Sequence, residues 1–289
     1  MDNISFCKLN AGGNDFVCID NCDGRYDEFI DAPEFPDFLI RLCRRGLGVG
    51  ADGIIFAEKA TVAGADIQAR FFEPDGSEVE LCGNGTACFV YWVVKCGMVK
   101  YDEIAIQTKA GINNGKKKDD GRCSVCVPNP FDYKRDICIT ADNKLIFTDF
   151  IVTGTGHAVI YVDDISKVPV ADCGASVRRH SAYGQAVNAN FVEILSEGHI
   201  AIRTFEFGVE AETLACGTGS ASAAMLTAVR HKWDYKFLNG MLPIEVDVQG
   251  GITLKVWFNY DEAEESFTDV CLETYVTPVY KGELCSELS

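Results

Sequence analysis

The chain has 289 residues, of which 47% are hydrophobic and 24% are charged. At about 150 residues per domain this length predicts roughly two globular domains, and the composition excludes a disordered or collagen-like chain. The formal net charge of −17 argues against binding to nucleic acid or to an anionic membrane surface.

The sequence shows neither a membrane-spanning run nor a secretory leader. Its longest apolar run, residues 87–94, is far shorter than the ~20 residues that cross a bilayer, and residues 1–5 lack the basic and apolar regions of a signal peptide. We therefore expect a cytoplasmic protein whose 14 cysteines are reduced thiols. Cys123 and Cys126 form one CxxC pair without a second pair at zinc-like spacing, so we expect no metal.

Short strands outnumber helices along the chain. Runs of alternating or β-branched residues predict strands at 4–9, 16–19, 67–72, 104–107, 123–127, 157–162, 191–195, 200–205, 244–248 and 252–258. Helices are expected over 32–45 and directly after Cys82 and Cys216. Residues 88–94 are apolar around the whole helix circumference, so that helix must be buried on all sides. These elements predict an α+β fold.

An internal repeat relates the two halves of the chain. Arg-Phe-Phe-Glu at 70–73 precedes Cys-Gly-Asn-Gly at 82–85, and Arg-Thr-Phe-Glu at 203–206 precedes Cys-Gly-Thr-Gly at 216–219. The arginine stands 12 residues before the cysteine in the first copy and 13 in the second. The repeat predicts two similar domains that face each other across a cleft.

The start of a helix that follows Cys-Gly-x-Gly is suited to catalysis. Its unpaired N–H groups bind anions, and its positive end favours thiolate, so we expect lowered pKa values for Cys82 and Cys216. Two such thiols suit stereoinversion: one removes the proton from the α-carbon of a bound carboxylate and the other protonates the opposite face. The helix ends would stabilise the carbanion charge without a cofactor. A hydrolase would need only one nucleophile.

These motifs resemble the diaminopimelate epimerase family, a group of cofactor-independent amino-acid epimerases and racemases. The resemblance covers nearly the whole chain and is carried by the two cysteine blocks together with residues 8–16, 48–53, 75–78, 154–157, 187–191 and 212–215. It implies two pseudo-symmetric domains, each a mixed β-sheet rolled around a central helix, with the active site in the cleft between them. We expect one domain over 1–120, completed by 273–289, with Cys82, and the other over 121–272 with Cys216.

The resemblance also implies roles for single residues. Cys82 and Cys216 match the acid–base pair, and His157 and Glu206 match positions that flank and tune the thiols. Contacts to the α-amino acid end of the substrate are implied for Asn14, Gly83, Asn84, Gly217 and Thr218. The expected partner is a small-molecule amino-acid substrate, and a homodimer is compatible with the resemblance.

The pocket for the far end of the substrate departs from the family. In members of the family, asparagines and an arginine hold that end of diaminopimelate. Of these residues this chain retains only Asn188, and it has Glu73, Thr155 and Phe207 at the other positions. A phenylalanine cannot replace the two hydrogen bonds of an arginine to a carboxylate. Three functions therefore stay open: epimerisation of LL- to meso-diaminopimelate, racemisation of a basic or aromatic amino acid such as histidine, lysine or ornithine, and a non-enzymatic amino-acid-binding module or related isomerase.

Overall fold

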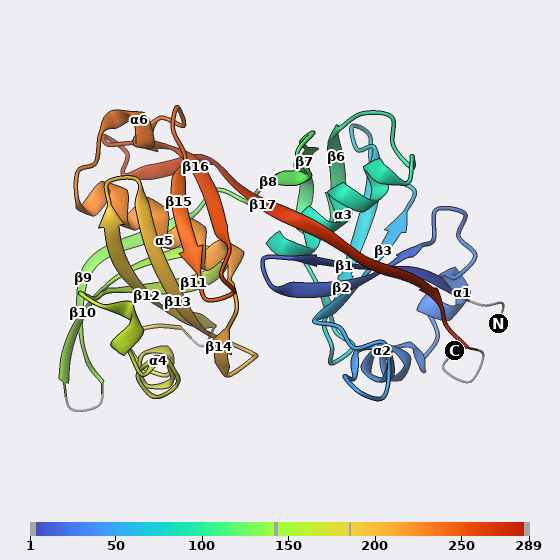
Figure 1. Ribbon diagram of the computed structural model, residues 1–289, viewed down its shortest axis with the longest axis horizontal. Helices are drawn as coiled ribbons and strands as arrows, with labels where there is room; N and C mark the ends of the chain where they lie inside the picture. The colour runs from blue at the N-terminus through green and yellow to red at the C-terminus, as the bar shows by residue number, and fades with distance from the viewer. Residues whose placement is uncertain (1–3, 142–143, 185, 286–289) are drawn as a thin grey trace. The chain divides into compact units, whose positions relative to one another are not determined.

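The structure, a computed structural model, describes residues 4–141, 144–184 and 186–285 (Figure 1). The chain divides into two compact units, which we call the N-terminal unit (1–125 with 274–289) and the C-terminal unit (126–273). The chain therefore passes between the units twice, after Val125 and after Glu273.

In its described residues the N-terminal unit is a mixed sheet with helices packed on it (Figure 1). Its helices are α1 (Asp27–Ile30), α2 (Phe35–Cys43) and α3 (Gly83–Lys95). Its strands are β1 (Ser5–Ala11), β2 (Asn14–Asp20), β3 (Gly53–Glu58), β4 (Ile67–Phe72), β5 (Glu78–Val79), β6 (Glu103–Thr108), β7 (Gly111–Lys117) and β8 (Arg122–Cys126), with the end of β17 (Ser266–Glu283) paired to β1.

The C-terminal unit has the same kinds of elements (Figure 1). Its helices are α4 (Val170–Arg178), α5 (Gly217–Arg230) and α6 (Tyr235–Leu238), with a 3₁₀ turn, η1, at Ile165–Lys167. Its strands are β9 (Phe131–Ala141), β10 (Lys144–Thr153), β11 (Thr155–Tyr161), β12 (Val187–Ser196), β13 (His199–Glu206), β14 (Ala211–Thr213), β15 (Ile244–Val248) and β16 (Thr253–Asp261), with the first half of β17 paired to β16.

Strand pairing repeats from one unit to the other. In the N-terminal unit β1–β2 is antiparallel, β2–β3 parallel, β3–β4 antiparallel and β4–β6 parallel. The C-terminal unit repeats this series as β10–β11, β11–β12, β12–β13 and β13–β15. The parallel crossover carries α2 in one unit and α4 in the other, and α3 and α5 occupy equivalent places after β5 and β14. The predicted α+β fold with an internal repeat is confirmed.

Helices α3 and α5 lie at the centre of their units. Helix α3 packs against β1, β2, β3 and β7, and Cys88, Phe89, Val90 and Val93 on it are completely buried. Helix α5 packs against β10 to β13, β15 and β16, and it is buried along nearly its whole length. Its alanines and serines let those strands approach closely, as its composition predicts.

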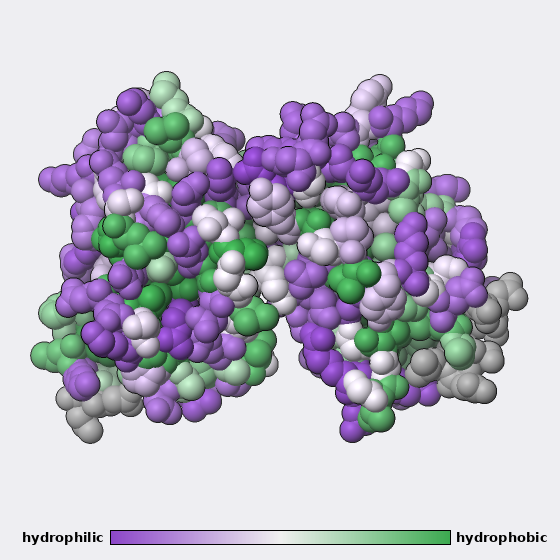
Figure 2. All heavy atoms as spheres, viewed as in Figure 1, coloured by the Kyte–Doolittle hydropathy of each residue, from purple (hydrophilic) through white to green (hydrophobic). Residues whose placement is uncertain are grey.

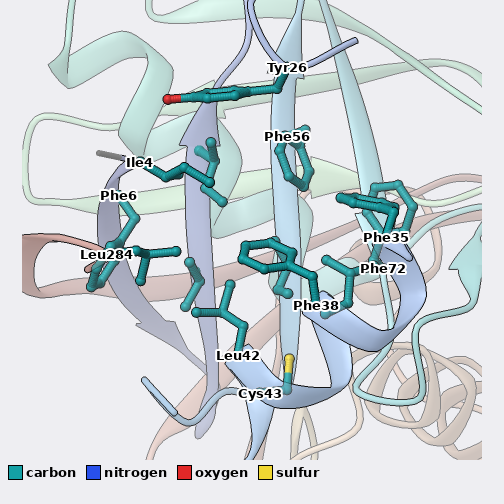
Figure 3. Close-up of a cluster of buried hydrophobic side chains, with 14 of the residues drawn as sticks. Ile4, Phe6, Tyr26, Phe35, Phe38, Leu42, Cys43, Phe56, Phe72 and Leu284 are labelled. Atoms are coloured by element: carbon teal, nitrogen blue, oxygen red, sulfur yellow. The ribbon is translucent and has the colours of Figure 1, made fainter. Parts of the chain in front are cut away.

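Helix α2 closes one face of the N-terminal sheet. Its buried side chains Phe35, Phe38, Leu42 and Cys43 point toward residues of β1 to β4, among them Phe56 (Figure 3). Glu34, Asp37 and Arg41 supply the polar face of the same helix, and Pro36 stands in its first turn, where a missing N–H does no harm. The amphipathic pattern expected over 32–45 thus yields a helix of nine residues.

The expectation that all cysteines are reduced is wrong for one pair. Cys126 at the end of β8 and Cys271 in β17 form a disulfide within the C-terminal unit. The two strands are adjacent there, since the Val127 N–H donates to the Val270 carbonyl at 2.9 Å. Because 145 residues separate the two cysteines in sequence, spacing along the chain gave no sign of the bond.

Polar side chains cover much of the face shown of each unit (Figure 2). Among the described residues, no helix is long and apolar enough to cross a membrane. The cytoplasmic location stays a prediction.

Candidate active site

The first cysteine block begins the central helix of the N-terminal unit. Cys82 is the N-cap of α3, and its Sγ accepts the Gly85 N–H at 3.4 Å. The hydroxyl of Thr86 donates to the Cys82 carbonyl at 2.7 Å, which fixes the same turn. Gly83 is the first helical residue, and a Cβ built on it would meet nothing within 4 Å, so a ligand has room at this point. The half-buried thiol therefore lies directly at a helix N-terminus.

Two of the predicted contact residues meet beside this turn. The Asn84 amide donates to Asn14 Oδ1 at 2.8 Å, and the Asn14 amide donates to Asp52 Oδ2 at 3.3 Å. Asn84 Oδ1 is buried and has no hydrogen-bond donor among the residues that the structure describes. The structure thus brings Asn14 and Asn84 together one turn from Cys82.

Sequence reasoning overlooked the charges that hold Asn14. Its neighbour Asp15 forms ion pairs with Lys8 (3.0 Å) and Arg45 (2.6 Å). Burial alone would raise the pKa of Asp15, but hydrogen bonds from these two cations lower it to about 2. Lys8 and Asp15 both belong to the 8–16 motif, so that motif contained the signal.

The second cysteine block begins the central helix of the C-terminal unit in the same way. Cys216 is the N-cap of α5 and its side chain is 6% exposed. Its Sγ lies 3.6 Å from Thr218 Oγ1 and 3.9 Å from Asn188 Nδ2. Gly217 is the first helical residue. The structure thus gathers Asn188, Gly217 and Thr218 around this thiol.

The predicted low pKa of Cys216 is wrong for the structure as it stands. Burial raises the pKa of this thiol well above its usual value, and the nearby Glu206 carboxylate raises it further. Hydrogen bonds from the Thr218 hydroxyl and the Gly219 N–H act in the opposite direction but are smaller effects. Loss of hydration and a neighbouring negative charge outweigh the helix N-terminus, so Cys216 holds its proton.

His157 supports Cys216 through Thr218. The ring is completely buried, and burial lowers its pKa to about 3, so it is neutral. Asn190 Nδ2 donates to His157 Nδ1 at 3.3 Å, which leaves the ring proton on Nε2, 3.1 Å from Thr218 Oγ1. The Thr218 oxygen accepts the His157 Nε2–H, so the Thr218 hydroxyl is oriented to donate its own hydrogen to the Cys216 sulfur.

Asn190 is a supporting residue that sequence reasoning did not name. Its amide also donates to the Ala158 carbonyl at 3.1 Å, and its Oδ1 accepts the Thr204 hydroxyl at 3.0 Å. Residues two apart on a strand share one face, so the Asn-x-Asn pattern at 188–190 could have identified it beside Asn188.

Glycine is required at the same place in both blocks. A Cβ at Gly85 would lie 3.2 Å from the Cys82 Cβ, and a Cβ at Gly219 would lie 2.6 Å from Asn190 Oδ1 and 3.2 Å from Cys216 Sγ. The second glycine of each Cys-Gly-x-Gly motif thus lets the thiol pack against its own helix.

The arginines of the repeat brace the segments that lead to the thiols. Arg70 on β4 makes two hydrogen bonds to Glu78, at 2.9 and 3.1 Å. Arg203 on β13 makes two to Glu212, at 2.6 and 2.7 Å, and also donates to the carbonyls of Ile165 and Val168. These arginines therefore have a structural role.

The positions expected at the far end of the substrate divide between the units. In the C-terminal unit, the Phe207 N–H donates to Asn188 Oδ1 at 2.7 Å, which links it to the surroundings of Cys216. Thr155 starts β11, opposite Thr153 on β10. Glu73, in the N-terminal unit, begins the turn after β4, where its N–H donates to the Ser77 carbonyl.

Comparison with known proteins settles the family. The sequence profile of the family "Diaminopimelate epimerase" matches residues 6–127 and 150–267. The chain is also 33% identical to the diaminopimelate epimerase of Aquifex aeolicus over 99% of both proteins, and 36% identical to that of Methanothrix thermoacetophila over 78% of this chain and 81% of that one. The chain belongs to the diaminopimelate epimerase family. It is accordingly an isomerase of the epimerase and racemase kind.

Solved structures of the same fold extend beyond diaminopimelate epimerases. A PhzF-family phenazine biosynthesis protein of Bacillus anthracis superposes with a TM-score of 0.70 at 18% identity, over 99% of this chain and all of that one. A probable proline racemase of Agrobacterium radiobacter K84 gives 0.72 at 14% identity, over 98% and 93%. These two likenesses show the two-domain fold alone.

Proposed function

We propose that this protein epimerises the α-carbon of an amino acid with Cys82 and Cys216 as the acid–base pair, and that its substrate is diaminopimelate, converted from the LL to the meso form. One observation carries the proposal: each thiol is the N-cap of a buried central helix, at equivalent places in a repeated topology. A pair of matched thiols is what removal and return of a proton on opposite faces of one carbon requires.

The surroundings of the Cys216 thiol suggest which cysteine is the acid and which is the base. Cys216 holds its proton, so it is the acid, and Cys82 is the base in the same direction of turnover. The α-proton moves to Cys82 Sγ, and the Cys216 proton moves to the opposite face of the α-carbon. Thr218, oriented by His157, then donates a hydrogen bond to the new Cys216 thiolate. Solvent exchange or the reverse reaction resets both thiols.

The carbanion needs stabilisation during this transfer. Its charge spreads onto the substrate carboxylate, for which the free N–H groups at the starts of α3 and α5 are suitable donors. The scheme uses no cofactor, so activity should persist without added pyridoxal phosphate and in the presence of carbonyl reagents.

The test is incorporation of deuterium from D₂O at the α-carbon of LL-diaminopimelate. Cys82→Ala and Cys216→Ala should each reduce racemisation by at least about 100-fold, because each removes a proton-transfer group. Cys96→Ala is the matched control, since Cys96 lies exposed at the other end of α3. Full activity in either thiol variant would contradict the scheme.

The proposal also requires that both sulfurs reach one small substrate. Mild oxidation should then join Cys82 to Cys216 and stop turnover, and a thiol reductant should restore it. Peptide mapping of the oxidised protein checks the bond. Inactivation without that cross-linked peptide would count against a shared site.

Of the three other functions that stay open, one has specific support. Phe207 in place of the family's arginine favours a racemase for a basic or aromatic amino acid, and the exchange assay with histidine, lysine and ornithine tests it. An amino-acid-binding module would bind ligand after alkylation of both cysteines and show no exchange, whereas a related isomerase would act on a cyclic substrate and reject linear amino acids.

A further inference from the structure

Three cysteines of the N-terminal unit take no part in the mechanism proposed above. Cys7 is on β1, Cys18 is on β2, and Cys96 is the C-cap of α3, at the opposite end of that helix from Cys82. All three are free thiols. Their arrangement suits a chemistry of their own.

Cys7 and Cys18 stand directly opposite each other in the antiparallel pairing of β1 with β2, so their side chains share one face of the sheet. Their neighbours Phe6, Val17 and Ile19 belong to the core under α2, and alternate residues of a strand point to opposite faces. The two thiols therefore project toward the other face, where α3 packs on β1 and β2. Residues paired in this way have Cα atoms about 4.5–5.5 Å apart, a distance that a disulfide bridges without backbone movement.

Helix α3 extends from the hairpin end of these strands toward the two thiols. At its start, a Cβ on Gly85 would lie 3.3 Å from the ring of Phe16, close to the β1–β2 turn, whereas Cys7 and Cys18 are at the other end of the strand pair. Burial raises the pKa of both thiols, and negative charge on Cys96 adds to this increase in each. The end of α3 at Cys96 therefore lies close to the cross-strand pair.

The three thiols differ in their access to solvent. Cys96 is exposed, whereas Cys7 is 7% exposed and Cys18 is completely buried, so a reagent larger than water meets Cys96 first. Lys281 on β17 stands opposite Cys7 in the pairing with β1, and its ammonium group opposes the effect of burial on the pKa of Cys7. Cys7 is thus better suited than Cys18 to attack a disulfide formed on Cys96.

We propose that these cysteines form a thiol–disulfide exchange site for low-molecular-weight disulfides such as glutathione disulfide. The Cys96 thiolate attacks one sulfur of the reagent, forms a mixed disulfide and releases one small thiolate. The Cys7 thiolate attacks the Cys96 sulfur of that bond and releases the second small thiolate. Cys18 then attacks the Cys7 sulfur, which returns Cys96 to a thiolate. In sum, Cys7 and Cys18 are oxidised to a cross-strand disulfide, and the reagent is reduced to two thiols.

The buried position favours this product. A thiolate is disfavoured there because burial removes its hydration, whereas a disulfide carries no charge and loses little on burial. The exposed Cys96 is the sulfur that is left as a thiolate in water.

The test is incubation of the folded protein with glutathione disulfide, followed by peptide mapping without reduction and tandem mass spectrometry. The wild type should form the Cys7–Cys18 cross-link and regain Cys96 as a thiol. Cys138 is the internal control, because it is an exposed thiol whose partner across β10 is Phe147. Glutathione should therefore remain attached to Cys138.

Single variants should trap the separate steps. Cys7→Ala should retain glutathione on Cys96, Cys18→Ala should accumulate a Cys7–Cys96 cross-link, and Cys96→Ala should lose the Cys7–Cys18 cross-link. Because Cys96 is exposed, Cys96→Ala keeps the test conclusive if the two buried variants do not fold.

Glutathione that stays on Cys96 of the wild type to the same extent as on Cys138 would overturn the proposal. A Cys7–Cys18 bond that forms equally fast in the wild type and in Cys96→Ala would also overturn it, since the reagent would then not enter through Cys96. Cys82→Ala should leave the exchange unchanged, which separates this site from oxidation of the proposed acid–base pair, and loss of the Cys7–Cys18 bond in that variant would contradict the proposal.

Discussion

At the start of α3 the Cys82 thiol is half-buried, whereas at the start of α5 the Cys216 thiol is 6% exposed and lies near the Glu206 carboxylate. The backbone is alike in the two places: both cysteines are extended N-cap residues followed by glycine. Burial and the Glu206 carboxylate raise the pKa of the Cys216 thiol. A duplicated backbone can thus supply two thiols in equivalent places while the side chains around them differ.

The units also differ in how the first and last segments of each unit are joined. In the C-terminal unit the Cys126–Cys271 disulfide joins residues near both chain crossings, whereas in the N-terminal unit the first and last strands, β1 and β17, are joined by backbone hydrogen bonds. Replacing both cysteines by serine should lower the free energy of unfolding by about 2–4 kcal/mol. Urea denaturation under non-reducing conditions measures this loss.

The control for the disulfide is Cys138→Ser, because Cys138 is an exposed free thiol of the same unit. Titration of the denatured, unreduced protein should detect the 12 free thiols. Detection of all 14 cysteines as thiols would show that the bond does not form.

The repeated arginines allow a direct comparison of the two braces. Arg203 pairs with Glu212 and also donates to two backbone carbonyls, whereas Arg70 pairs with Glu78 and, at 3.6 Å, with Glu58. Arg203→Met should therefore lower the free energy of unfolding by about 2–3 kcal/mol and Arg70→Met by about 1–2 kcal/mol, since both sites are partly hydrated. Denaturant titration measures both values, and a larger loss for Arg70→Met would contradict the assignment.

The glycines that contact the thiols should respond unequally to one added methyl group. Gly219→Ala places a Cβ 2.6 Å from a buried amide oxygen and should destabilise the protein by about 1–3 kcal/mol, whereas Gly85→Ala has contacts no closer than 3.2 Å and should lose less. Gly83→Ala, where the added Cβ meets nothing within 4 Å, is the control for stability. Thermal unfolding ranks the three variants, and an order other than 219, 85, 83 would refute the packing argument.

The C-terminal unit should be the more sensitive to acid, because it contains all four histidines of the chain. Burial holds the pKa of His157 at about 3, below the value of about 6.5 in an unfolded chain. Between pH 3 and pH 6.5 the His157 ring is protonated in the unfolded chain but not in the folded protein. Its contribution to the free energy of unfolding is therefore fully present above pH 6.5 and decreases as the pH falls toward 3.

His157→Gln removes the titrating ring and keeps hydrogen-bonding groups. Between pH 7 and pH 5 the wild type should lose about 1–2 kcal/mol more stability than the variant. The measurement is denaturant unfolding at both pH values, with His199→Gln as the control because His199 is partly exposed and pairs with Asp247. Equal pH dependence in wild type and His157→Gln would exclude a neutral buried ring.

Much of the fold could be predicted because the hydrophobic pattern of many segments agrees with the burial of their side chains. The strands expected at 67–72 and 244–248 have the same bounds as β4 and β15. The long hairpin of β9 and β10 was missed because Leu145 and Phe147 on it are 71% and 59% exposed, so its hydrophobic residues do not follow the pattern of a half-buried strand. Strand β17 was missed although it supplies partners to both units.

The site could be predicted less completely than the fold. Cys82, Cys216, Asn14, Asn84, Asn188 and Thr218 stand in motifs, and within each unit the structure places these residues around the thiol concerned. The pKa of Cys216 was predicted with the wrong sign because sequence shows a helix N-terminus but not the depth of burial.

The sequence by itself determined the duplication, the central helices and the cysteine that begins each of them, because periodicity and glycine spacing are local properties of the chain. The tertiary structure decided the proton that Cys216 holds and the disulfide between Cys126 and Cys271. Each of these depends on distances between segments remote in sequence and on the water that folding removes, which no linear pattern specifies.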